Sequence, residues 1–376
     1  MKNSFGNSVT VTLFGESHGA QIGAVIDGLA PGIDVDHDYI AEKLTLRRPA
    51  GLLSTARSEQ DEFCIASGVF EGKTPGAPLC ILIPNKDTRS KDYGAIRKLA
   101  RPGHADYTAY CKYHGFEDYR GGGHFSGRIT APLVAAGAIV QKALEQKGIW
   151  IGTHILRCGT LQDCAFSDIP NEIQQLGKKE FPVLDPAAAE AMQEAILAAR
   201  KDCDSIGGVL QTAVTGLPAG VGEPWFDTVE SVLAHVLFSV PAVKGVEFGD
   251  GFALAHMRGS EANDPFRMEQ GAVRTVTNRN GGINGGITNG MSLLFQCAIK
   301  PTPSIAKLQK TVDFAAKEDS DILIEGRHDP AIFHRARVVI DSVTALALCD
   351  LLALRYGTDA LAIKGPFSAP FELKTI

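Results

Sequence analysis

Glycines and cationic side chains are concentrated in residues 101–130, RPGHADYTAYCKYHGFEDYRGGGHFSGRIT, and this stretch constrains the fold more than any other. Lys and Arg are rarely buried without a partner, and glycine adds little packing area, so the stretch cannot be core. Consecutive glycines, as at residues 121–123, let backbone N–H groups approach an anion closely. Thr130 then begins a helical pattern whose first N–H groups have no partner within the helix. The stretch predicts an anion-binding site, with a solvated loop as the alternative.

The composition excludes several classes of partner. The chain has 376 residues, of which 44% are hydrophobic and 21% charged, as in ordinary soluble proteins. Its net charge of -6 argues against long-range attraction to nucleic acid or an anionic membrane. No apolar run reaches about 18 residues, so a membrane-spanning helix is not expected, and no signal-peptide pattern is present. The eight cysteines lack CxxC and zinc spacings, so we expect a reduced, cytoplasmic protein.

Strand and helix patterns are mixed along the chain. Residues 8–14 and 21–26 predict two strands on either side of GESHG at residues 15–19. Further strands are expected at residues 79–83, 149–155, 207–215 and 291–299. Helices are expected at residues 36–48, 130–148, 186–200 and 341–356, with others beginning at Asp227 and Ile305. Residues 163–177 show no clear period and predict a surface excursion. Because strands and helices do not follow βαβ order, the expected class is α+β.

Two glycine motifs come close to known active-site patterns, and only the first leaves an alternative activity open. GESHG has the G-x-S-x-G spacing of a serine-hydrolase elbow at Ser17, but that elbow needs a helix after the turn and a strand pattern follows here. A hydrolase therefore stays as the alternative enzyme class. GVFEGKT at residues 68–74 is one residue short of a phosphate-binding P-loop, and no dinucleotide-binding G-x-G-x-x-G follows a strand.

Histidines are the candidate acids and bases. His18 and His104 both lie among glycines and polar residues, a setting typical of proton transfer beside an anion. His328, Asp329 and His334 have metal-binding chemistry, but no third ligand stands at a recognised spacing. We therefore expect no metal, and a structural or catalytic role for this group.

A set of motifs together resembles the chorismate synthase family, from residue 14 to about residue 345. The motifs are GESHG at residues 15–19, RPGHADYT at 101–108, DYRGGG at 118–123, SGR at 126–128, AVKGVEFGDGF at 242–252, KPTPS at 300–304 and GRHDP at 326–330. The resemblance implies one domain over residues 1–376, with helices sandwiched between antiparallel β-sheets, assembled as a homotetramer. It also implies anti-1,4-elimination of phosphate from 5-enolpyruvylshikimate 3-phosphate to give chorismate, in the shikimate pathway of aromatic amino acid biosynthesis. Reduced FMN is required without net redox change.

The resemblance also implies roles for individual residues. His18 would protonate the departing phosphate, His104 would act as an acid beside the reduced flavin, and Asp329 would assist proton removal, with Ser17 and Ser126 as relay candidates. Expected substrate-binding residues are Arg47, Arg48, Arg128 and Arg327. Expected FMN contacts are His124, Phe125, Ser126, Pro241, Ala242, Gly285, Lys300, Pro301, Thr302, Pro303, Ser304 and Arg327.

Two departures from the family pattern concern the cofactors. The family usually reads RSSAR where this chain has HFSGR, so His124 and Phe125 replace a cation and a hydroxyl at the FMN contact. Some relatives carry an Arg linked to NADP binding near Leu53, which is apolar here, although Arg57 is a possible substitute. We therefore expect a separate source of reduced flavin. A flavin or anion binder without turnover is the non-enzymatic alternative.

Overall fold

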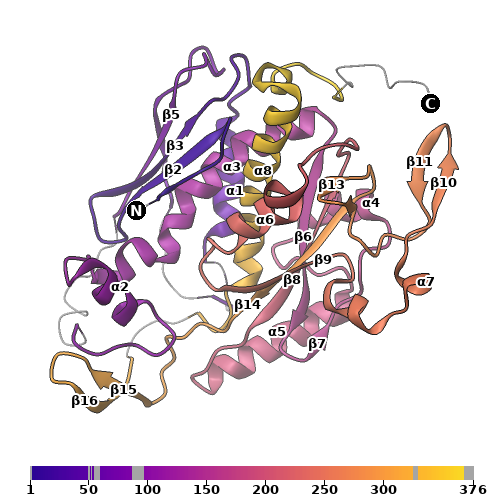
Figure 1. Ribbon diagram of the computed structural model, residues 1–376. Coiled ribbons are helices and arrows are strands. Elements are labelled where there is room, and N and C mark those ends of the chain that lie inside the picture. Colours follow the sequence, from indigo (N-terminus) through magenta and orange to yellow (C-terminus); the bar gives the residue numbers. More distant parts are fainter. Residues whose placement is uncertain are drawn as a thin grey trace.

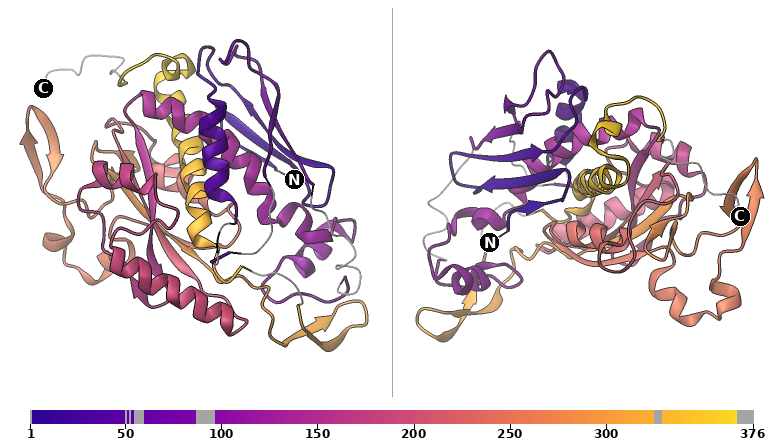
Figure 2. Two further views of the ribbon diagram at one scale, coloured as in Figure 1. Left: turned by 180° about the vertical axis from the view of Figure 1, so that it is seen from behind. Right: turned by 45° about the horizontal axis from the view of Figure 1, so that its top comes forward.

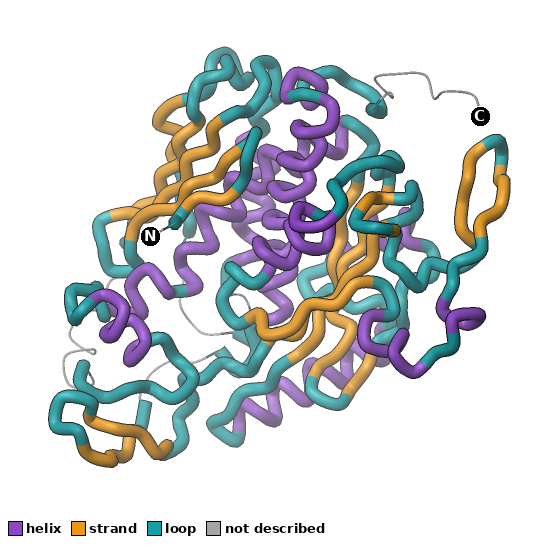
Figure 3. Tube along the Cα trace, viewed as in Figure 1, coloured by secondary structure: helices purple, strands orange, loops and turns teal. Residues whose placement is uncertain are grey.

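Helices form a layer between two five-stranded sheets in which every strand pair is antiparallel (Figure 1). The computed structural model describes residues 2–49, 51, 53–54, 60–86, 97–324 and 329–367. The same layers are visible when helices and strands are coloured separately (Figure 3). The expected α+β sandwich is confirmed.

The first sheet has the strand order β1-β2-β3-β5-β4. Its strands are β1 Ser4–Phe5, β2 Thr10–Gly15, β3 Gln21–Asp27, β4 Cys64–Ser67 and β5 Leu79–Pro84. In β5 every second side chain, beginning with Leu79, is buried, as expected for a strand with one face on a core. Gly15 pairs with Ile22 at the end of the β2–β3 ladder, so the intervening residues form a protruding tip. The strands predicted on either side of GESHG are confirmed.

The second sheet has the order β7-β6-β8-β14-β9. Its strands are β6 Trp150–Cys158, β7 Leu161–Gln162, β8 Gly208–Thr215, β9 Val243–Phe248 and β14 Leu293–Ile299. Most of β6 is buried, which matches a strand covered on both faces. The strands predicted at residues 149–155, 207–215 and 291–299 are confirmed.

Two long helices form the centre of the middle layer. α3 contacts strands of both sheets, α8 contacts β6 and β8, and α1 lies against both helices (Figure 2). Gly137 of α3 faces Ser342 of α8, where an added Cβ would come within 2.4 Å of the serine Cβ. A glycine here lets the two helices approach closely. The bounds are α1 His37–Arg47, α3 Thr130–Gln146, α6 Val229–Leu237 and α8 Phe333–Tyr356.

The predicted helix signals are mostly confirmed. The Asp36 side chain accepts a hydrogen bond from the Tyr39 N–H and caps α1, and Gly357 ends α8 with a positive φ of 81°. The cap of α6 is Thr228, which accepts from the Ser231 N–H, so the predicted cap at Asp227 was wrong by one residue. α8 begins at Phe333, well before the predicted start at residue 341.

Two stretches differ from the sequence expectation. Residues 163–177 contain the short helix α4, Ile169–Leu176, which packs Ile173 and Leu176 inward, so a featureless excursion was wrong. The helix expected from Ile305 is instead the hairpin of β15 Gln309–Asp313 and β16 Glu318–Ile322. Leu308, an apolar residue of that helical pattern, is 69% exposed. The helical spacing of the apolar residues from Ile305 onward therefore does not correspond to the buried face of a helix.

The remaining elements lie at the edges of the sandwich. The hairpin of β10 and β11 projects from the main body (Figure 1). None of the helices in the described ranges is long and apolar enough to cross a membrane. The bounds are α2 Asp106–Tyr113, α5 Pro186–Lys201, α7 Gly259–Ala262, β10 Phe266–Glu269, β11 Ala272–Thr275, β12 Ile283–Asn284 and β13 Ile287–Thr288.

Candidate active site

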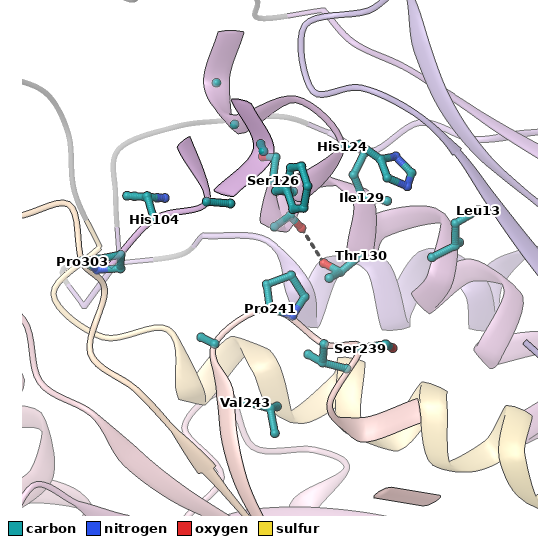
Figure 4. A pocket seen from close by; sticks show the side chains of 18 of the residues that line it. Leu13, His104, His124, Ser126, Ile129, Thr130, Ser239, Pro241, Val243 and Pro303 are labelled. Atoms are coloured by element: carbon teal, nitrogen blue, oxygen red, sulfur yellow. Dashed lines mark hydrogen bonds between the residues drawn. The ribbon is translucent and has the colours of Figure 1, made fainter. Parts of the chain in front are cut away.

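Two adjoining cavities lie at the N-terminal end of α3. The larger has a volume of about 830 Å³ and the smaller about 280 Å³. His104, Ser126, Pro241 and Pro303 stand around the larger cavity (Figure 4). The residues that line both cavities are Ser126, Gly127, Thr130, Val240, Pro241, Asp329, Ile332 and Arg335. A ligand in one cavity therefore shares a wall with a ligand in the other.

The glycine run at residues 121–123 receives the tip that carries His18. All three glycines have positive φ, and the Ser17 N–H donates to the Gly123 carbonyl at 3.1 Å. A Cβ at Gly121 would lie 2.1 Å from Cε1 of His18. Only glycine leaves room for the histidine ring in this conformation. Ser17 and His18 line neither cavity themselves, but they contact Gly121, which lines the larger one.

The Ser17 hydroxyl fixes which ring nitrogen of His18 carries a proton. Its Oγ lies 3.1 Å from the Arg120 carbonyl oxygen, 3.0 Å from that of Gly121 and 3.1 Å from His18 Nδ1. Carbonyl oxygens can only accept, so the single hydroxyl proton of Ser17 points toward them. The contact with His18 must then be made by Nδ1–H, which donates to Oγ. Neutral His18 is thus protonated on Nδ1, and Nε2 is the nitrogen that gains or loses a proton.

Residues 101–108 and 300–304 meet on another wall of the larger cavity. His104 Nε2 lies 2.7 Å from the Ser304 hydroxyl, and the Lys300 ammonium donates to the Gly103 carbonyl at 2.5 Å. Thr302 lines the same cavity, and its buried Oγ1 has no hydrogen-bond partner among the described residues. Burying a hydroxyl without a hydrogen-bond partner is energetically costly, so this hydroxyl is suited to bind a polar ligand atom.

Arginines dominate the smaller cavity. Its lining includes Arg47, Arg48, Arg128 and Arg335, together with two aspartates. The Nε groups of Arg48 and Arg335 are buried and have no hydrogen-bond partner within the described part of the chain. Unpaired buried donors on cationic groups favour an anionic ligand.

Three polar residues of this site carried no sequence signal. The Asp61 carboxylate pairs with both Arg47 and Arg128. The Asn85 amide accepts from Arg128 Nε at 3.1 Å and donates to the carbonyls of the tip that carries His18. Arg335 holds Asp329 with a contact of 2.6 Å between Nη2 and Oδ2. These partners are distant in sequence or lie in ordinary polar context, so no motif marks them.

Most of the residues predicted from the sequence gather at the two cavities. Those lining the larger cavity are His104, His124, Phe125, Ser126, Pro241, Ala242, Lys300, Thr302, Pro303 and Asp329, and those lining the smaller are Arg47, Arg48, Ser126, Arg128, Pro241 and Asp329. Ser304 reaches the site through His104, whereas Gly285 and Pro301 line neither cavity. Arg327 lies outside the described residues.

The two departures from the family pattern have local structural consequences. The Phe125 ring packs edge-on against Tyr113, with ring centroids 6.1 Å apart, and His124 Nδ1 donates to the Gly15 carbonyl at 2.8 Å. Leu53 packs against the hydrophobic core. Arg57 lies outside the described residues.

His334 is a buried structural histidine. Its Nε2 lies 2.9 Å from the Ser54 hydroxyl, and burial, followed by the charges of Arg335 and Arg337, lowers its pKa to about 3. No cluster of potential metal ligands exists among the described residues, and His328 lies outside them. The structural alternative for His334 is therefore supported.

The geometry does not support the hydrolase alternative. A serine-hydrolase elbow needs a helix after the serine, whereas strand β3 follows Ser17.

Comparisons with known proteins agree on one family. The family model described as "Chorismate synthase" matches residues 9–353. The chorismate synthase of Pyrococcus abyssi is 45% identical over 351 residues, which cover 93% of this chain and 97% of the relative. That of Aeropyrum pernix is 43% identical and covers 94% of this chain and 93% of the relative. A solved structure titled "Crystal Structure of Chorismate Synthase" superimposes with a TM-score of 0.74 at 26% identity, covering 94% of both chains.

Proposed function

The chain belongs to the chorismate synthase family, and from this premise we propose how its two cavities divide the reaction between cofactor and substrate. Membership makes the protein a carbon–oxygen lyase of the shikimate pathway. In our proposal the larger cavity holds reduced FMN and the smaller holds 5-enolpyruvylshikimate 3-phosphate. The observation that supports this assignment most strongly is that Ser126, Asp329 and Arg335 line both cavities.

The smaller cavity suits a substrate with three anionic groups. A phosphate and two carboxylates need several fixed cations, and arginine offers a planar fork to each. The buried Nε groups of Arg48 and Arg335 supply donors that have no acceptor among the residues the structure describes. Leaving such a donor buried and unpaired costs about 1–3 kcal/mol, which an anionic ligand removes.

The larger cavity suits a flavin mononucleotide. Its walls combine the glycine backbone at residues 121–122, the Lys300 ammonium, the Thr302 hydroxyl and the Phe125 ring. Cofactor sites commonly combine apolar surface with a few placed polar groups in this way. When bound, reduced FMN would supply electron density to the reacting substrate without net oxidation or reduction. Phe125 cannot offer a hydroxyl, so we expect backbone donors and ring packing to replace that contact.

The elimination breaks the carbon–oxygen bond to phosphate, removes one proton from carbon and leaves a new carbon–carbon double bond. In our proposal His18 gives the Nε2 proton to the departing phosphate while Ser17 holds Nδ1. Asp329, positioned by Arg335 between the two cavities, assists removal of the carbon proton. His104, held by Ser304, is the acid beside the flavin. Ser126 lies on the shared wall as a relay candidate.

We also propose that the protein works as a homotetramer supplied with reduced flavin by another source. Large apolar side chains are exposed in ways that favour association, such as Trp225 at 83% and Phe226 at 90% exposed. The projecting β10–β11 hairpin adds Phe266 and Met268, at 64% and 68%. Leu53 packs against the core and offers no cation to a nicotinamide nucleotide phosphate.

The test is an anaerobic assay of phosphate release and chorismate absorbance, with the substrate and photoreduced FMN. We expect turnover that stops when flavin is omitted. Oxidised FMN with NADPH but no reductase should give no sustained turnover. Binding of FMN without any phosphate release would favour the non-enzymatic alternative. Flavin-independent ester hydrolysis that is lost in Ser17→Ala would favour the hydrolase.

A further inference from the structure

Asp61 is a buried carboxylate shared by two arginines of the smaller cavity. Its side chain is 0% exposed, and its backbone has a positive φ of 49°. Oδ2 pairs with Arg47 Nη1 at 3.0 Å, and Oδ1 pairs with Arg128 Nη1. A non-glycine residue in this backbone conformation is uncommon and is often found where a side chain must be aimed at a site.

The other nitrogens of Arg47 tie it to the beginning of α3. Nε donates to the Thr130 hydroxyl at 2.9 Å, and Nη2 donates to the Gly127 carbonyl at 2.9 Å. Arg47 comes from the end of α1, so Asp61 and these oxygens fix its fork between two helices. Its side chain is only 11% exposed, which leaves little freedom to reorient.

The Nε group of Arg128 ties it to the tip that carries His18. Nε donates to Asn85 Oδ1 at 3.1 Å, and the Asn85 Nδ2 donates to the carbonyls of Glu16 and Gly19, each at 2.9 Å. Two donated bonds fix the orientation of the amide, so its oxygen must face Arg128. Asp61 thus holds a cation that is connected through one side chain to the His18 tip.

We propose that Asp61 is a positioning residue for the elimination: it fixes the forks of Arg47 and Arg128 against the substrate cavity and, through Arg128 and Asn85, the tip beneath His18. The proposal rests on the function proposed above. Two guanidinium groups brought together without a carboxylate would repel each other and turn away from their present geometry. Small misplacements of binding groups are known to cost large factors in rate, so a fixed anchor is valuable. The competing role is a resident anion that the substrate must displace.

The kinetic test compares Asp61→Asn with a matched buried carboxylate outside the site. Asp61→Asn keeps the shape but presents an amide N–H to one arginine. We expect KM for the substrate to rise by about tenfold or more, which corresponds to roughly 1.4 kcal/mol, with a smaller change in kcat. Asp61→Glu, which keeps the charge, should recover part of that loss.

The control is Asp350→Asn, because Asp350 is also buried and accepts the N–H groups of Asn7, Ser8 and Val9. The Asp350→Asn variant should be less stable than the wild type but should have the same KM for the substrate.

Binding of inorganic phosphate, measured by calorimetry, gives a readout that does not depend on turnover. We expect weaker phosphate binding in Asp61→Asn and no change in Asp350→Asn. Tighter phosphate binding with a lower KM in Asp61→Asn would identify a competing anion and overturn the proposal. Unchanged KM and phosphate affinity would overturn it too, while leaving the proposed function intact. If the wild type shows no turnover and Asp61→Asn binds phosphate more weakly, the proposed function is contradicted and the positioning role of Asp61 is supported. If Asp61→Asn does not fold, Asp61→Glu tests the proposal instead. A wild-type KM and phosphate affinity in Asp61→Glu would contradict the idea that Asp61 fixes the geometry of the two arginines.

Discussion

Ser17 and Ser304 each hold one of the two histidines proposed to act as acids. Ser17 Oγ lies 3.1 Å from His18 Nδ1, and Ser304 Oγ lies 2.7 Å from His104 Nε2. In both cases the serine contacts a single ring nitrogen and restricts the orientation of the imidazole. The protein itself therefore orients the two proposed acids.

We predict that His18→Ala and His104→Ala each lower kcat by about 10²-fold or more, the usual range for loss of a positioned acid. Ser17→Ala should give a smaller loss and shift the pH profile of kcat, because Nδ1 loses its acceptor. Phosphate release is the measurement, and the exposed His256 supplies the control His256→Ala. Activity near that of the wild type in His18→Ala would show that His18 is an ordinary turn histidine without a catalytic role.

His334 should make stability depend on pH. Its folded pKa of about 3 lies below the usual 6.5, so the unfolded chain binds a proton first as the pH falls. The stability it contributes is present above pH 6.5 and is lost between pH 6.5 and about 3, with a slope of up to about 1.4 kcal/mol per pH unit. His334→Gln cannot titrate, and its free energy of unfolding should fall less steeply between pH 6.5 and 4 in urea titrations. Parallel curves for the two proteins would contradict this assignment.

At the scale of elements, the site is built where loops from separate elements meet at the start of α3. The β2–β3 tip rests on the glycine run, and residues 101–108 contact residues 300–304. The glycine and cation pattern predicted that these loops bind an anion. It could not predict their partners, because contacts such as that between Asp61 and Arg128 join residues 67 positions apart.

Local signals explain which elements were predicted. Caps at Asp36 and Gly357 act within a few residues, so sequence alone reveals them. The β15–β16 hairpin was missed because Leu308 and Val312 imitate a helical stripe although both are exposed. α4 was missed because it is short and buries only Ile173 and Leu176. Pattern reasoning assumes that apolar residues are buried, and it is wrong where the tertiary structure leaves them exposed.

Gly121→Ala should disable the site through the element it supports. The new Cβ would meet the His18 ring at 2.1 Å, and the positive φ of 57° adds about 1–2 kcal/mol of strain. We expect kcat to fall about as far as in His18→Ala. Gly72→Ala is the matched control, because Gly72 also has a positive φ of 76° and an added Cβ would meet no atom within 4 Å. Equal kcat in both variants would show that contact with His18 does not explain the glycine.

At the scale of the whole molecule, both sheets pack on the same helices. One hydrophobic core includes residues of the first sheet, the helix layer and the second sheet, from Val9 to Leu361. We therefore propose that the chain forms a single domain, as the family resemblance implies. The two cavities lie at one end of that layer, so the proposed cofactor and substrate sites share the N-terminal end of α3.

The central claim is that the two cavities form one composite site in which flavin and substrate bind together. Calorimetric titration of FMN, with and without saturating 5-enolpyruvylshikimate 3-phosphate, tests it most directly. We predict that the substrate tightens FMN binding by at least about tenfold, or roughly 1.4 kcal/mol, and that Arg48→Gln reduces this coupling. An FMN affinity that is the same with and without the substrate would contradict the account.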